Sequence, residues 1–171
     1  DPVAGRGAFA PRADGDDAAF NASRAGAEAN YTITRAGFNY VYQFRNEWQA
    51  RWTANGQYTN DLLVSGEQYG IGGPDSVRGY LLREVAMDKG GATQAELYTP
   101  DFARGIGLSD SFRLRMLAFY DYGQVRRNDP LPGALTKESL ASTGVGVRLG
   151  YTKSAAVLVD AAYILTETAT L

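Results

Sequence analysis

Residues 140–152, which read LASTGVGVRLGYT, are the stretch that decides the fold. Every second residue is apolar or a threonine, and the residues between are small or polar. The first set is Ala141, Thr143, Val145, Val147, Leu149 and Tyr151, and the second is Ser142, Gly144, Gly146, Arg148, Gly150 and Thr152. A period of two residues is typical of a β-strand with one apolar and one polar face.

The same alternation extends through most of the chain. It predicts strands over residues 27–44, 47–58, 93–102, 112–125, 140–152 and 155–166. Several runs keep the alternation for about a dozen residues, which exceeds the usual 5–6 of soluble strands and is enough to cross a bilayer at a tilt. The pattern therefore favours an all-β fold, an antiparallel transmembrane β-barrel. A soluble β-sandwich, whose oily faces would pack on each other, is the alternative.

Composition excludes several functions. The 171 residues carry 17 Lys plus Arg and 19 Asp plus Glu, a formal net charge of -2, so we expect no nucleic-acid partner. Because the chain has no Cys and no His, ordinary zinc sites and bases built on imidazole are excluded. We expect no metal, no cofactor and no enzymatic activity. The chain also lacks an apolar run of the roughly 18–20 residues that a membrane helix requires.

The chain divides into two parts on its patterning. Residues 1–25 are rich in Gly, Ala, Asp and Arg without a period, which predicts a loop or a poorly ordered entry segment. The acidic run at residues 14–17 lacks the spaced ligands of a calcium loop. Residues 26–171 are expected to form a partial β-barrel, interrupted at about residues 72–90 by a long Gly-flanked loop.

Two short motifs resemble a known family. Residues 72–80, GGPDSVRGY, resemble the inward-folded loop of outer-membrane barrels that carry N-terminal POTRA domains, and residues 119–123, FYDYG, resemble the matching motif on the barrel wall. The stretch before the loop, residues 56–71, is more like the two-partner-secretion branch, TpsB, than the insertase branch of the same superfamily. TpsB is a haemolysin and haemagglutinin secretion-activation family. The loop motif comprises Gly72, Gly73, Ser76, Val77, Arg78, Gly79 and Tyr80, and the wall motif comprises Phe119, Asp121 and Gly123.

The resemblance implies a fold, a location and partners. Such barrels close with about sixteen strands, so this chain would hold the C-terminal strands, with further strands and the POTRA domains preceding it. The implied function is an outer-membrane pore that secretes a partner exoprotein, an adhesin or haemolysin, through a barrel embedded in outer-membrane lipid. The implied location is the bacterial outer membrane. The insertase branch of the same superfamily shares both motifs and is an alternative function.

The residues themselves support a contact between the loop and the wall. Asp121 falls on the face of its strand opposite Leu114, Met116 and Tyr120, so it points into the lumen if those side chains face lipid. Arg78 at the loop tip would then reach Asp121 and pair its planar guanidinium group with the carboxylate. The resemblance implies the same pair. Losing one partner would cost about 3–5 kcal/mol if the pair is fully buried, and less if water enters.

Other interpretations of these residues carry less weight. The loop could be an exposed Gly-rich hairpin. Residues 70–73 could cradle a phosphate, but no Lys-Ser/Thr pair follows them. Glu96 and Asp121 could be a glycosidase pair, but nothing places them at one substrate. Five arginines are expected to line the lumen as solvated side chains: Arg35, Arg51, Arg113, Arg115 and Arg148.

Overall fold

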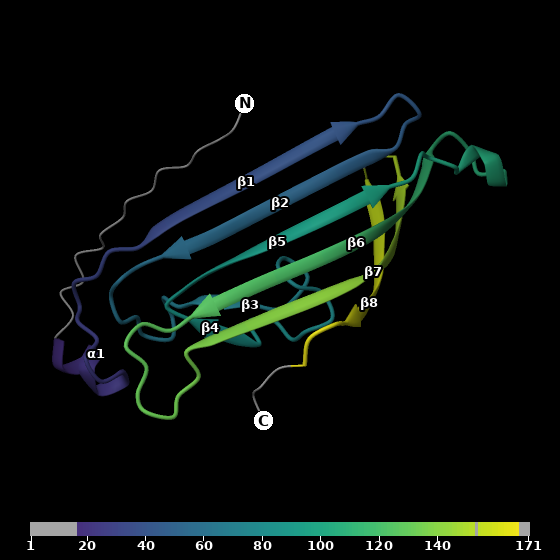
Figure 1. Cartoon of the computed structure of the whole chain (residues 1–171). Helices are drawn as coiled ribbons and strands as arrows, with labels where there is room; N and C mark the ends of the chain where they lie inside the picture. The colour runs from purple at the N-terminus through teal and green to yellow at the C-terminus, as the bar shows by residue number, and fades with distance from the viewer. Residues whose placement is uncertain (1–16, 153, 168–171) are drawn as a thin grey trace.

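The fold is an open, curved antiparallel sheet with a long loop lying on one of its faces (Figure 1). The computed structural model describes residues 17–152 and 154–167. The main sheet has the order β1-β2-β5-β6-β7-β8, and every neighbouring pair is antiparallel. Its strands are β1 (Thr34–Gln43), β2 (Gln49–Tyr58), β5 (Lys89–Tyr98), β6 (Phe112–Arg126), β7 (Lys137–Tyr151) and β8 (Ala155–Ile164).

The remaining elements are short. Helix α1 (Asp17–Ser23) precedes the sheet, and η1 (Arg104–Ile106) lies between β5 and β6. Strands β3 (Tyr69–Ile71) and β4 (Val85–Met87) pair with each other within the long segment between β2 and β5. None of the helices in the described residues is both long and apolar enough to cross a membrane.

The strand register joins the apolar sets of neighbouring strands into one surface. Tyr40 of β1 lies opposite Trp52 of β2, Trp52 lies opposite Ala95 of β5, and Ala95 lies opposite Tyr120 of β6. Because side chains alternate between the faces, this register keeps every apolar set on the same side of the sheet. The polar sets form the opposite face.

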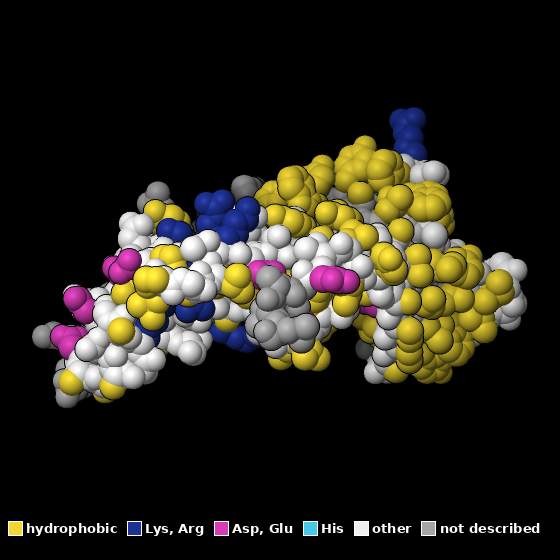
Figure 2. Space-filling model, turned by 60° about the horizontal axis from the view of Figure 1, so that its bottom comes forward, with side chains coloured by type: hydrophobic (Ala, Val, Ile, Leu, Met, Phe, Trp, Pro, Cys, Tyr) yellow, Lys and Arg dark blue, Asp and Glu magenta, His cyan; other side chains and the backbone are white. Residues whose placement is uncertain are grey.

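The apolar face is not covered by other parts of the described chain. Its exposed side chains include Phe38, Tyr40, Tyr42, Trp52, Met116, Tyr120, Val145, Val147, Val157, Val159 and Tyr163. Figure 2 shows hydrophobic side chains gathered in a broad area over the right half of that view. An apolar area on this scale marks a surface that contacts another protein or a membrane.

The hydrophobic core lies between the sheet and the loop. Its buried side chains are Ile71, Val77, Tyr80, Val85, Met87, Ala92, Val125 and Leu140. The first five come from residues 69–87, which we call the inward loop, and the last three come from the polar faces of β5, β6 and β7. The inward loop therefore packs on the concave side of the sheet, against β5, β6 and β7.

The main elements agree with the expected all-β antiparallel class, although several bounds differ. Strand β1 begins at Thr34, not at residue 27, because residues 27–33 have no pairing partner and instead bury Tyr31 and Ile33 against Leu63. Residues 17–23 form α1 where the sequence predicted a loop, and residues 1–16 lie outside the described residues. Strand β5 begins at Lys89 and takes in the end of the expected loop.

Candidate functional site

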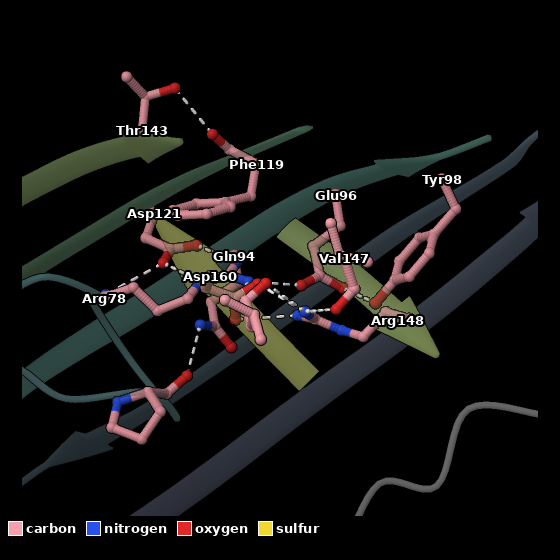
Figure 3. Close-up of polar contacts among 12 residues, drawn as sticks. Arg78, Gln94, Glu96, Tyr98, Phe119, Asp121, Thr143, Val147, Arg148 and Asp160 are labelled. Carbon is pink, nitrogen blue, oxygen red and sulfur yellow. Dashed lines mark hydrogen bonds and ion pairs between the residues drawn. The ribbon is translucent and has the colours of Figure 1, made fainter. Parts of the chain in front are cut away.

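Arg78, near the middle of the inward loop, is the centre of the candidate site (Figure 3). Its guanidinium donates to both oxygens of Asp121 on β6: Nε to Oδ2 at 2.7 Å and Nη2 to Oδ1 at 2.8 Å. The Arg78 backbone N–H donates to the same carboxylate, at 3.1 Å. This is the fork-to-carboxylate geometry that only arginine can make.

Two further carboxylates approach the same guanidinium from other strands. Arg78 Nη1 donates to Glu96 Oε1 of β5 at 2.8 Å and lies 3.7 Å from Asp160 Oδ2 of β8. Asp160 is also held by Arg148 of β7, through bonds of 2.6 and 2.9 Å. The network therefore joins two guanidinium groups and three carboxylates, and it spans four strands and the loop.

Phe119 lies beneath the guanidinium. The Arg78 Cζ atom is 3.6 Å from the centroid of the Phe119 ring, which is the stacking geometry of a cation–π contact. Opposite Phe119 on β7 is Gly144, where a β-carbon would collide with the ring and with the Ala161 carbonyl. Gly144 thus provides the space in which the ring lies flat under Arg78.

The loop reaches the wall through backbone conformations that glycine permits. Gly72, Gly73 and Gly79 all have positive φ, at 109°, 94° and 92°. The Ser76 hydroxyl accepts a hydrogen bond from the Gly72 N–H at 2.8 Å, which tightens the turn before Arg78. After the turn, Tyr80 donates its hydroxyl to the Ala141 carbonyl of β7 at 3.0 Å, so the returning arm is also fixed to the wall.

Gly123 allows the loop to lie close to β6. A β-carbon there would stand 3.0 Å from Val77 Cγ2 and 3.1 Å from Ile71 Cγ2. Both loop residues are fully buried. The absence of a side chain at Gly123 is therefore what sets the depth at which the loop packs.

The centre of the site is buried and strongly charged. The Asp121 side chain has no exposed surface, and that of Arg78 is 7 % exposed. Burial alone would lower the pKa of Arg78, but its hydrogen bonds to Asp121 and Glu96 outweigh burial and raise the pKa above its ordinary value. Arg78 is thus permanently charged, and the network is suited to holding a loop rather than to transferring protons.

The structure brings together residues that lie far apart in the sequence. Arg78 and Asp121 are in direct contact, and Ser76, Val77, Gly79 and Tyr80 position the loop around them. Glu96 and Asp121, considered above as a catalytic pair, both accept hydrogen bonds from Arg78. The contacts of Glu96, Arg148 and Asp160 were not predicted. The strand patterning placed Arg148 on a polar face, but only the strand register shows that Glu96 and Asp160 share that face and lie close to Arg78.

The other arginines expected on the inner face have weaker partners. Arg35 donates to Gln57 Oε1 at 2.8 Å, Arg51 lies over the Tyr98 ring, and Arg115 donates to the Thr99 carbonyl at 2.7 Å. Arg113 is 4.0 Å from Asp101 with an exposed side chain. Within residues 17–152 and 154–167, no group of three acidic side chains is arranged to hold a metal ion.

Comparison with known proteins gives one match. Residues 5–149 match the family model described as haemolysin secretion/activation protein ShlB/FhaC/HecB. No curated protein and no solved structure matches the chain.

Proposed function

Since the chain belongs to the haemolysin secretion/activation family ShlB/FhaC/HecB, we propose that it forms part of a bacterial outer-membrane pore that secretes a partner exoprotein, an adhesin or haemolysin. The family is one of outer-membrane transporters, and its members form β-barrels. In this proposal, residues 26–171 are a section of the barrel wall. Further strands of the same protein close it, and POTRA domains preceding the barrel capture the exoprotein.

The observation that carries the proposal is the difference between the two faces of the sheet. One face exposes aromatic and aliphatic side chains along its whole width, as a surface in contact with lipid tails would. The other face carries the charged network and the inward loop. We propose that the first face contacts the lipid hydrocarbon and that the second face lines the aqueous lumen of the pore.

The Arg78 loop has a defined role in this pore. It occupies the concave face, where the exoprotein would pass, and its closest ionic contact with the wall is the pair Arg78–Asp121. We propose that this pair locks the loop in one position and thereby sets the width of the lumen. No bond-making chemistry is part of the proposal.

The proposal is tested by conductance and secretion together. The full-length protein is placed in planar bilayers as wild type, Arg78→Ala and Asp121→Ala, and the amount of exoprotein released by cells that carry each variant is measured. We expect both variants to change the open-state conductance and to reduce secretion, because each leaves the other charge buried without its main partner.

Arg104→Ala is the matched control. Arg104 pairs with Asp110 at 2.7 Å, but both side chains are more than three-quarters exposed, so this variant should behave as wild type. If Arg78→Ala and Asp121→Ala both leave conductance and secretion unchanged, the lock is disproved. If secretion persists in all variants while other outer-membrane barrels fail to assemble, the insertase alternative is favoured.

A further inference from the structure

A second buried ion pair lies at the root of the inward loop. Arg24, which follows α1, donates through Nη2 to Asp88 Oδ2 at 2.8 Å and through Nη1 to Asp88 Oδ1. Asp88 follows β4 directly, so it stands where the loop rejoins the sheet. Its side chain has no exposed surface, and that of Arg24 is 16 % exposed. Such a pair is costly to bury and therefore demands complete hydrogen bonding.

Asp88 meets this demand through backbone groups of two other segments. Its Oδ1 accepts from the Leu63 N–H at 2.9 Å, and its Oδ2 accepts from the Asn128 N–H at 2.7 Å. Leu63 belongs to the outgoing arm of the connection between β2 and β5, whereas Asn128 belongs to the connection between β6 and β7. One carboxylate thus ties three segments together.

Arg24 connects the same three segments from the other side. It donates to the Leu63 carbonyl at 2.7 Å and to the Asn128 carbonyl at 3.2 Å, besides its two bonds to Asp88. The Asn128 side chain then donates to the carbonyls of Thr59 and Asp61, each at 3.0 Å. Every one of these contacts lies at the end of the sheet where α1 and the loop roots gather (Figure 1).

We propose that Arg24 and Asp88 are positioning residues for the inward loop, forming a root lock that holds it in the lumen independently of the Arg78–Asp121 tip lock. This inference rests on the proposed function. The tip lock fixes residue 78 to β6, and the root lock fixes residue 88 to the segment before β1 and to the β6–β7 connection. Releasing one lock leaves the loop attached at the other, so full withdrawal requires both to open.

The test measures how often the loop leaves the wall. Because residues 1–171 contain no cysteine, Ser76→Cys introduces one thiol into this part of the protein, at a loop position that is 8 % exposed. Any cysteine elsewhere in the full-length protein is replaced by serine. The full-length protein with Ser76→Cys is reconstituted in lipid vesicles and labelled with a water-soluble maleimide. Adding Asp88→Asn should raise the labelling rate more than about tenfold, because the Arg24 charge then lacks its buried partner. Adding Arg78→Ala as well should raise it further.

Two controls separate loop positioning from general loosening. Ala103→Cys places a thiol at a buried site in the β5–β6 connection, at the end of these strands opposite the β6–β7 connection, and Asp88→Asn should leave its labelling rate unchanged. Arg24→Lys retains the charge but loses the bidentate contact with Asp88. Its thiol at position 76 should therefore be labelled faster than in the protein with Arg24 and more slowly than in Arg24→Gln. This series decides the matter if Asp88→Asn fails to fold.

An unchanged rate at Ser76→Cys in Asp88→Asn, or in Arg24→Gln, overturns the root lock. So does an equal rise at Ser76→Cys and Ala103→Cys, since that reports loss of stability throughout. Labelling does not depend on export of an exoprotein. A protein that responds as expected but secretes nothing therefore disproves the proposed function and leaves the root lock standing.

Discussion

At the scale of single residues, the wall motif of β6 is explained by the alternation of side chains along a strand. Phe119, Asp121 and Gly123 are two residues apart, so they point to the same face of the sheet. Phe119 lies under the Arg78 guanidinium, Asp121 binds its edge, and Gly123 leaves space for the loop beside it. Phe119 and Asp121 therefore both contact Arg78, whereas Gly123 lies against Val77 and Ile71 of the same loop.

Substitution of the glycines on the inner face should reveal which contacts are rigid. A β-carbon at Gly144 would meet a backbone carbonyl of β8 and the Phe119 ring, neither of which can move freely. We expect Gly144→Ala to lower the free energy of unfolding by about 1–3 kcal/mol, as overpacking of a filled site does. Denaturant unfolding of the reconstituted protein measures this change.

Gly123→Ala and Gly37→Ala complete the series. A β-carbon at Gly123 would meet only side-chain atoms of Val77 and Ile71, at 3.0–3.2 Å, and no backbone atom, so a smaller loss is expected. At Gly37 the nearest atom would be 3.9 Å away, which is ordinary contact, and we expect almost no change. A larger loss at Gly37 than at Gly144 would contradict this account of the inner face.

At the scale of elements, the inward loop behaves as a small folded unit. Strands β3 and β4 pair with each other, and the residues between them close on themselves through the Gly73–Val77 bridge. The loop buries its own apolar side chains against β5, β6 and β7, so the hydrophobic effect holds it on a face that is otherwise polar. Ionic contacts at residues 78 and 88 then fix where it lies.

The root of this loop should be sensitive to acid. Burial by itself raises the pKa of Asp88, but the hydrogen bonds from Arg24 and from the Asn128 and Leu63 amides outweigh it and hold the pKa below the ordinary value. A lowered pKa in the folded state means that the stabilisation is complete above the ordinary pKa of about 3.9 and is lost as the pH falls through the lowered value.

We therefore expect wild type to lose stability as the pH falls below about 4, and Asp88→Asn to be less stable at neutral pH with a flatter pH profile. Unfolding of the reconstituted protein between neutral and strongly acidic pH measures both. Asp101 also has a lowered pKa, because its bonds to the Ala103 and Leu114 amides outweigh its slight burial, so Asp101→Asn serves as the reference for the remaining acid sensitivity. Identical profiles for wild type and Asp88→Asn would contradict the assignment.

At the scale of the whole molecule, the unusual feature is that the hydrophobic core lies on the concave side of the sheet, while the apolar outer face is uncovered. In a soluble sandwich the apolar face would be the core, but here it is covered by nothing in the described chain. The concave side instead holds the loop and its charged contacts. This inverted arrangement suits a protein with lipid outside and water inside.

A charge placed on the outer face distinguishes lipid from water. Val145 of β7 is 56 % exposed, so in water Val145→Arg would cost little. If the face meets hydrocarbon near the middle of the bilayer, the same change should destabilise the reconstituted protein by about 2–4 kcal/mol. Leu158 of β8 lies on the inner face of the sheet, opposite Arg148, and its side chain is 64 % exposed. Leu158→Arg should therefore be tolerated. Equal tolerance of both changes would exclude lipid contact at Val145.

The sequence by itself determined the class of fold and the two motifs. The alternation of residues 140–152 and of its neighbours depends only on the period of a β-strand, which is a local property, so six strands and their oily faces could be located in advance. The family membership expected from residues 72–80 and 119–123 is confirmed by the family match. The ends of the strands were less accurate, because pairing partners set them.

Only the tertiary structure decided which residues share a site. Glu96, Asp160 and Arg148 join Arg78 because the strand register and the curvature of the sheet carry β5, β7 and β8 to the same point. The Arg24–Asp88 pair likewise joins residues that are 64 positions apart in the sequence. Such contacts depend on where distant segments meet in space, and the periodicity of a single strand carries no information about that.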